Sequence, residues 1–263
     1  MNDPNTERFT GVSSIYDKYR PGYPKALIDI LSADISFSTK DKVADIGSGT
    51  GKLSSLFLDN GNIVYGVEPN DKMRSEAERK FRNEKKFISI QGSAEKTGLD
   101  EKSVNLVAAG QSFHWFNQSL AKIEFKRVLQ PGGHVVLIWN TRIPDGSALN
   151  AGFEDICRQY SNGYHGSGSL GVDDKIIRSF FSADIIYRSL KSSQILDFDG
   201  LLGRYMSASY SLKKEDPHFP EVVEKMKDLF KEHSKKKTGS SFFMIRKFTL
   251  GNHKSLQQKI QIK

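Results

Sequence analysis

Residues 42–52, KVADIGSGTGK, join a short apolar run to three glycines at alternate positions. The apolar run has the length of a buried strand, and residues 53–61 have the spacing of a helix that ends at a glycine. Glycines at such a turn let the backbone bend sharply and let a ligand approach where a Cβ would collide. The stretch therefore predicts a strand, a ligand-binding turn and a helix.

Strand and helix patterns alternate on both sides of this turn, from about residue 40 to residue 140. The sequence predicts strands at 42–47, 62–69, 86–92, 103–110 and 133–140, and helices at 53–61, 71–81 and 119–129. Beyond residue 140 it predicts helices near 153–160 and 221–233, and strands at 185–198 and 240–250. Alternation of this kind indicates an α/β fold, in which right-handed βαβ units build a parallel sheet.

Length and composition bound the class of protein. The 263 residues, of which 37% are hydrophobic, suit a single domain with a small cap. No apolar run is long enough to span a bilayer, and the N-terminus has no signal-peptide pattern. Cys157 is the single cysteine, which excludes an internal disulfide and a cysteine-rich zinc site. We therefore expect a cytoplasmic protein with no membrane span and no metal site.

Positive charge is concentrated near the C-terminus. The net charge is +8, and residues 213–263 hold 13 Lys and Arg against 6 Asp and Glu. Such a region can bind nucleic acid or an acidic membrane surface, or it can be a solvated, lysine-rich face. Aromatic and basic residues do not interleave as in RNA-binding motifs. A small-molecule substrate is therefore favoured, with nucleic acid kept as an open alternative, and nothing in the sequence indicates an oligomeric state.

Three classes of ligand compete for the glycine turn. A phosphate-binding loop needs glycine five residues before Gly51 and Ser or Thr after Lys52, but Ile46 and Leu53 occupy those positions. A dinucleotide site needs G-x-G-x-x-G, and Lys52 stands at its third glycine. The pattern D-x-G-x-G-x-G is matched in full, by Asp45, Gly47, Gly49 and Gly51.

This last pattern resembles motif I of the class I S-adenosylmethionine-dependent methyltransferases. VYGVEPNDKM at 64–73, VNLVAAGQSFHWF at 104–116 and FKRVLQPGGHVVLIWN at 125–140 resemble later segments of the same family. YDKYRPGYP at 16–24 and the FHWF segment are similar to a subgroup that includes enzymes like trans-aconitate methyltransferase. The resemblance is strong over residues 14–142 and loose over residues 180–251.

The resemblance implies a Rossmann-like, doubly wound, seven-stranded and mostly parallel sheet with its last strand antiparallel, plus a helical cap. It implies one methyltransferase domain over residues 1–263. Its parts are an N-terminal lid (1–40), a cofactor-binding core (41–142), a helical cap with strand six (143–235), and a last strand with a basic tail (236–263). The expected enzyme uses S-adenosyl-L-methionine to methylate a small molecule with a carboxylate or hydroxyl. The alternatives are an RNA or protein methyltransferase, or a non-catalytic binder of the cofactor.

The resemblance also implies roles for particular residues. Glu68 would bind the ribose hydroxyls, Asp45 the methionine ammonium, and Met73 the adenine ring, with Ser93 a weaker acceptor than the usual aspartate. The expected cofactor-binding residues are Tyr16, Arg20, Asp45, Gly47, Ser48, Gly49, Gly51, Glu68, Pro69, Met73, Ser93, Ala94, Glu95 and Gln111.

Other residues have two competing interpretations. His114 has the pKa range of a general base, or it is a packed structural residue between aromatic rings. Arg20 and Arg142 either pair with an acidic substrate or form structural ion pairs. Lys52 is expected to point to solvent.

Overall fold

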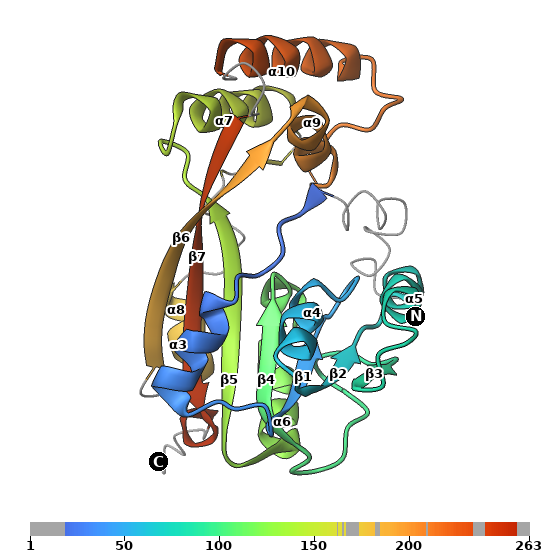
Figure 1. The fold of residues 1–263 in the computed structure, drawn as a ribbon, viewed down its shortest axis with the longest axis vertical. Helices are drawn as coiled ribbons and strands as arrows, with labels where there is room; N and C mark the ends of the chain where they lie inside the picture. Colours follow the sequence, from blue (N-terminus) through green and yellow to red (C-terminus); the bar gives the residue numbers. More distant parts are fainter. Residues whose placement is uncertain are drawn as a thin grey trace, which may run out of the picture.

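The computed structural model describes residues 19–161, 163–164, 166, 174–181, 185–208, 210–233 and 240–256. These residues form a seven-stranded sheet with the strand order β3-β2-β1-β4-β5-β7-β6 (Figure 1). The strands are β1 (Lys42–Ile46), β2 (Ile63–Val67), β3 (Phe87–Ile90), β4 (Val104–Gly110), β5 (Leu129–Arg142), β6 (Ile185–Leu196) and β7 (Ser240–Asn252). β1 to β5 pair in parallel, and β7 runs antiparallel to β5 and β6. The predicted fold class is confirmed.

Successive residues of a strand point to opposite faces of the sheet, so buried apolar side chains occur on both faces. Helices cover each face. On one face, α3 (Ala26–Ile35) and α4 (Lys52–Asp59) pack on a cluster that contains Val43 and Val136. On the other face, α6 (Gln118–Val128) and α8 (Asp174–Phe181) pack on a cluster that contains Ala44 and Val135. α5 (Asp71–Lys80) lies beside β3 (Figure 1).

Three helices form a separate layer beyond the carboxyl ends of the core strands. These are α7 (Ala148–Tyr160), α9 (Phe198–Met206) and α10 (Phe219–His233), which Figure 1 shows at the top of the molecule. Phe153, Tyr205 and Met226 lie in the apolar cluster that these helices share. The antiparallel pair of β6 and β7 extends upward into this layer.

Two helices that fall inside the ranges predicted for the N-terminal lid and the cap pack on the sheet. Residues 26–35, placed by sequence in the N-terminal lid, form α3, which buries Leu27 and Leu31 against the sheet. α8, inside the range expected for the cap, packs through Phe180 and Phe181 on the sheet. Neither these two helices nor α9 was predicted. Among the described residues, no helix is long and apolar enough to cross a bilayer.

The position of β1 determines where a ligand can bind. β1 pairs with β2 on one side and with β4 on the other, so the connections that leave these strands diverge at their carboxyl ends. Open α/β sheets bind ligands in the crevice formed at such a switch point. The glycine turn of residues 47–51 follows β1 directly, at this crevice.

Candidate functional site

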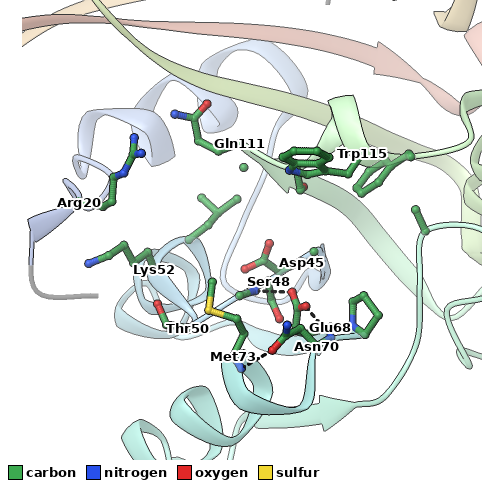
Figure 2. A pocket seen from close by; sticks show the side chains of 18 of the residues that line it. Arg20, Asp45, Ser48, Thr50, Lys52, Glu68, Asn70, Met73, Gln111 and Trp115 are labelled. Atoms are coloured by element: carbon green, nitrogen blue, oxygen red, sulfur yellow. Dashed lines mark hydrogen bonds between the residues drawn. The ribbon is translucent and has the colours of Figure 1, made fainter. Parts of the chain in front are cut away.

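A cavity of about 670 Å³ lies at this crevice, a size suited to a small molecule (Figure 2). Most residues that the sequence assigned to a cofactor line it: Arg20, Asp45, Gly47, Ser48, Gly49, Glu68, Pro69, Met73, Ser93, Ala94, Glu95 and Gln111. The structure therefore gathers residues at and beyond the carboxyl ends of β1, β2, β3 and β4, together with the N-terminal segment, around one space.

The three glycines of the turn all have left-handed backbone conformations, with φ of +67° at Gly47, +57° at Gly49 and +77° at Gly51. A Cβ on Gly47 would lie 2.6 Å from the Cβ of Ser112, and one on Gly51 would lie 2.3 Å from a ring carbon of Phe81. A Cβ on Gly49 would meet only the Met73 methyl, at 3.7 Å. Close packing requires Gly47 and Gly51, whereas backbone conformation alone favours glycine at residue 49. Gly51 faces Phe81 and is not part of the cavity wall.

Glu68 connects the glycine turn to the end of β2. Its Oε2 accepts the Gly49 N–H at 2.8 Å, and its Oε1 accepts the Asn70 N–H at 2.8 Å. Burial raises the pKa of Glu68, and these two N–H groups oppose that rise. Because each carboxylate oxygen has a further lone pair, Glu68 can still accept hydrogen bonds from a diol in the cavity. Asn70 also caps α5 by accepting the Met73 N–H at 3.0 Å, which fixes Met73 at the wall.

Asp45 is a buried carboxyl at the end of β1. Its Oδ2 accepts a hydrogen bond from the Ser54 hydroxyl at 2.6 Å. Burial raises the pKa of Asp45 to about 7, although hydrogen bonds from Ser54 act against the rise, and nearby Glu68 adds to it. A cationic ligand group would favour the ionised form of this carboxyl.

Cations line the opposite side of the cavity. Figure 2 shows Arg20 and Lys52 on one side and Asp45 and Glu68 on the other. Arg204, a buried residue of α9, also lines the wall. Arg20 donates from Nη2 to the carbonyl of Ser207 at 3.1 Å, which joins the N-terminal segment to the end of α9. Lys52 is half-buried at the wall, which differs from the solvent-facing position expected from sequence.

An aromatic and amide wall lies beyond β4. Trp115 and Phe116 line the cavity at the 3-10 turn Phe113–Trp115. Gln111 has a left-handed φ of +60°, and its Nε2 donates to the carbonyl of Asn140 at 3.1 Å. Tyr23 packs closely on Gly110, where a Cβ would lie 2.5 Å from the Tyr23 hydroxyl.

Some predicted residues lie elsewhere. His114 does not line the cavity; it packs beside Trp115, and burial lowers its pKa to about 4. Arg142 is also absent from the wall: it lies 3.1 Å from Glu154 and donates to the Tyr210 hydroxyl at 2.8 Å. Tyr16 lies outside the described residues.

Several wall residues were not predicted as ligands. Asn140 is at the end of β5, where the sequence showed only a buried strand, and Arg204 is on α9, a helix that the sequence did not predict. Asn70 carried a usable signal, because it stands at the N-cap position of the predicted helix after β2. Arg204 carried none, since only tertiary packing brings the cap to this crevice.

The polar groups of the wall discriminate between the ligand classes. A pyrophosphate would meet the carboxylates of Asp45 and Glu68, and the Gly49 N–H is already occupied by Glu68. A ligand with a diol, an ammonium and a carboxylate has complementary groups at Glu68, Asp45 and the cationic side. S-Adenosylmethionine carries these groups and no phosphate, so the residues present fit it better than they fit a dinucleotide.

Residues 44–137 match a family described as a methyltransferase domain. An uncharacterized methyltransferase of Mycobacterium tuberculosis (strain ATCC 25618 / H37Rv) is 34% identical over 134 residues, which are 51% of this chain and 52% of that protein. The chain thus spans about half the length of this relative. A malonyl-[acyl-carrier protein] O-methyltransferase of Marinomonas sp. (strain MWYL1) is 25% identical over 79% of this chain and 74% of that protein.

A solved structure of a putative type II methyltransferase from Anaeromyxobacter dehalogenans shares the fold, with a TM-score of 0.61 and 19% identity. The match covers 89% of this chain and 98% of that one. This likeness shows the fold that the two chains share, and residues 44–137 within that fold are the part that matches the methyltransferase domain.

Proposed function

Because residues 44–137 match a methyltransferase domain, we propose that the protein is an enzyme that transfers a methyl group from S-adenosylmethionine to an anionic small molecule. The observation that carries this proposal is the separation of charge across the cavity. Carboxylates of Asp45 and Glu68 lie on one side, and Arg20 and Lys52 lie on the other (Figure 2). We propose a single domain in which the N-terminal segment and the cap complete the site.

In this proposal the cofactor extends along the wall from Glu68 to Arg20. Glu68 holds the ribose diol, and Asp45 holds the ammonium group. Met73 and the segment 93–95 contact the adenine, and Arg20 or Lys52 holds the carboxylate of the methionine part. All of these residues line the one cavity.

The cofactor supplies an electrophilic methyl group on a sulfonium when it is bound. The protein must align the acceptor with that methyl and exclude water. Trp115, Phe116 and Tyr23 supply apolar surface for this purpose. An acceptor that is already a carboxylate needs no proton removed, so the reaction needs no general base and no step runs through His114.

An anionic acceptor is favoured because more cationic side chains line the wall than the cofactor's single carboxylate requires. Arg204, which lies on α9 of the cap, lines the cavity wall, and its guanidinium suits an acceptor carboxylate. The name of the Marinomonas relative, an O-methyltransferase, supports oxygen as the acceptor atom. The YDKYRPGYP and FHWF segments support the finer resemblance to enzymes like trans-aconitate methyltransferase.

The RNA methyltransferase alternative depends on a different part of the chain. Residues 234–263 hold 8 Lys and Arg and no Asp or Glu, so they account for the whole net charge of +8. The wall residues all lie between residues 20 and 204. The cavity therefore belongs to residues 1–233, which hold 31 Lys and Arg against 31 Asp and Glu, and this lack of net charge supports a small acceptor over a polyanion.

The test combines cofactor binding with acceptor screening. Calorimetry with S-adenosylhomocysteine should give micromolar binding. Labelled S-adenosylmethionine should then methylate members of a panel of mono-, di- and tricarboxylic acids, but not neutral alcohols or tRNA-sized RNA. Arg204→Gln should raise KM for the accepted acid at least tenfold, about 1.4 kcal/mol, without changing cofactor affinity. Arg82→Gln, at an exposed position away from the cavity, is the matched control. Transfer to RNA or to neutral alcohols alone would contradict the proposal.

A further inference from the structure

Ser54 lies beneath the cofactor cavity and touches one of its carboxyls. It is in the first turn of α4 and is 0% exposed, so it makes no contact with solvent. Its hydroxyl donates to the Oδ2 of Asp45 at 2.6 Å. The residue at the N-cap of α4 is Gly51, which offers no side-chain cap. The Ser54 hydroxyl therefore donates its hydrogen bond to Asp45 and does not cap the helix.

Burial and a nearby carboxylate oppose the ionisation of Asp45, whereas Ser54 favours it. Burial is the largest effect, and Glu68, from the end of β2, adds repulsion. The hydroxyl and the backbone N–H of Ser54 act in the other direction, and together they leave the pKa of Asp45 at about 7. Arg20, Lys52 and Arg204 line the same cavity from the N-terminal segment, α4 and α9. Within the described residues, no His or Cys lines the cavity.

We propose that Ser54 is a positioning residue that stabilises the Asp45 carboxylate for the cofactor's ammonium group, and that cofactor binding releases one proton from Asp45. This inference rests on the proposed function. The balance is simple: a protonated Asp45 carboxyl and a ligand ammonium become a carboxylate–ammonium pair, and one proton leaves to the buffer. No bond other than the O–H bond of the carboxyl breaks.

The proposal fixes the sign of the pH dependence. Below pH 7 the carboxyl of the free protein is mostly protonated, so binding must remove its proton, and affinity rises with pH. The limiting slope is close to tenfold per pH unit. At alkaline pH the ligand's own α-amino group loses its proton, which removes the positive partner of the Asp45 carboxylate. Affinity then falls, so binding is strongest between these two titrations.

The experiment is calorimetric titration of the full chain with S-adenosylhomocysteine from pH 5.5 to 8.5, in two buffers of different ionisation enthalpy. The wild type should lose about tenfold in affinity from pH 6.5 to pH 5.5 and release close to one proton at pH 6. Ser54→Ala should shift the rising limb upward by about one pH unit, because a charge-assisted hydrogen bond is lost. Affinity at pH 7 should then fall several-fold, up to about tenfold, and affinities near pH 8.5 should converge.

Two further variants make the assignment specific. Ser55→Ala changes the neighbouring residue of the same helix, whose side chain is not bonded to Asp45, and should leave the pH profile unchanged. Asp45→Asn should bind weakly, with no rising limb and no proton release. Asp45→Asn also tests the proton assignment if Ser54→Ala does not fold.

Each failure has a separate meaning. A wild-type affinity that is constant between pH 5.5 and 7, or binding without proton release at pH 6, would overturn the proton-coupled binding. Equal weakening of Ser54→Ala at every pH would show that Ser54 is only structural and would overturn its role. No binding of S-adenosylhomocysteine at any pH would refute the proposed function itself.

Discussion

Glu68→Ala is the substitution that most directly tests how the cavity is built. The side chain lies between two backbone donors, the N–H groups of Gly49 and Asn70, each at 2.8 Å. In the proposed complex its carboxylate also accepts hydrogen bonds from the ribose diol. Alanine removes all of these acceptors together, so the change should weaken cofactor binding and loosen the glycine turn.

The two effects differ in size. A hydrogen bond to a charged group contributes about 1.5–3 kcal/mol. Losing the diol contact should therefore weaken S-adenosylhomocysteine binding roughly 10- to 150-fold. An unpaired N–H costs about 1–3 kcal/mol when buried, but removal of a buried carboxylate offsets part of that loss. We expect a net loss of about 1 kcal/mol in folding free energy, or about 2–4 °C in Tm.

The assay pairs calorimetry with a thermal melt of the unliganded protein. Glu76→Ala, which removes an exposed ion pair with Arg79 within α5, is the matched control and should change neither quantity. Glu68→Gln keeps one oxygen acceptor and should bind with intermediate affinity. A Kd for Glu68→Ala within twofold of wild type, with a normal melt, would refute both the diol contact and the role of Glu68 in shaping the turn.

Three further changes test the packing around the site. Gly51→Ala places a Cβ 2.3 Å from an aromatic ring, whereas Gly132→Ala, also at positive φ, meets nothing within 4 Å. In thermal melts, Gly51→Ala should lower the free energy of unfolding by about 1–3 kcal/mol more than Gly132→Ala does. Glu154→Gln weakens the buried pair with Arg142 and should lower Tm by roughly 6–12 °C while leaving S-adenosylhomocysteine affinity unchanged. Burial lowers the pKa of His114 from 6.5 to about 4, so protonation of the imidazole opposes folding as the pH falls. Between pH 7 and pH 5 the free energy of unfolding, measured by urea titration, should therefore fall by about 2 kcal/mol less in His114→Phe than in the wild type.

The core of the fold was predictable because its signals are local. β1, the glycine turn and α4 follow one another in sequence, and apolar runs separated by helical patterns mark β2 to β5. β5 extends over 129–142, beyond the predicted 133–140, and its pairing with β4 shifts register between Val104 and Leu106. A pattern based on burial does not detect this extension, because Pro131 and Gly132 at its start are exposed.

The missed helices depend on contacts that are distant in sequence. α9 contains Gly200 and Gly203, which disfavour a helix by themselves. It forms because Asp197 caps it, accepting the Gly200 N–H at 2.7 Å, and because Leu201 and Tyr205 are buried in the cap. Without a prediction of this helix, Arg204 could not be placed at the cavity.

Asp45 and Glu68 could be placed from sequence because their positions depend on local strand patterns and not on contacts that are distant in sequence. Each lies within one residue of the carboxyl end of a strand next to the switch point, and the carboxyl ends of parallel strands meet at one edge of the sheet. What the sequence could not give is their state of ionisation. That depends on burial and on Ser54, whose hydroxyl faces Asp45 only after α4 has packed on β1.

These observations separate the construction of the cofactor end from that of the acceptor end. Ser112 packs against Gly47 and Phe81 packs against Gly51, so contacts within the protein hold the glycine turn in its conformation. The cationic side is assembled from distant segments, with Arg20 bonded to the end of the helix that carries Arg204. Both arginines lie outside residues 44–137, the part that matches the methyltransferase domain. Changes in the cap, which carries Arg204, can therefore alter the acceptor without disturbing the cofactor site, so acceptor specificity should follow the cap.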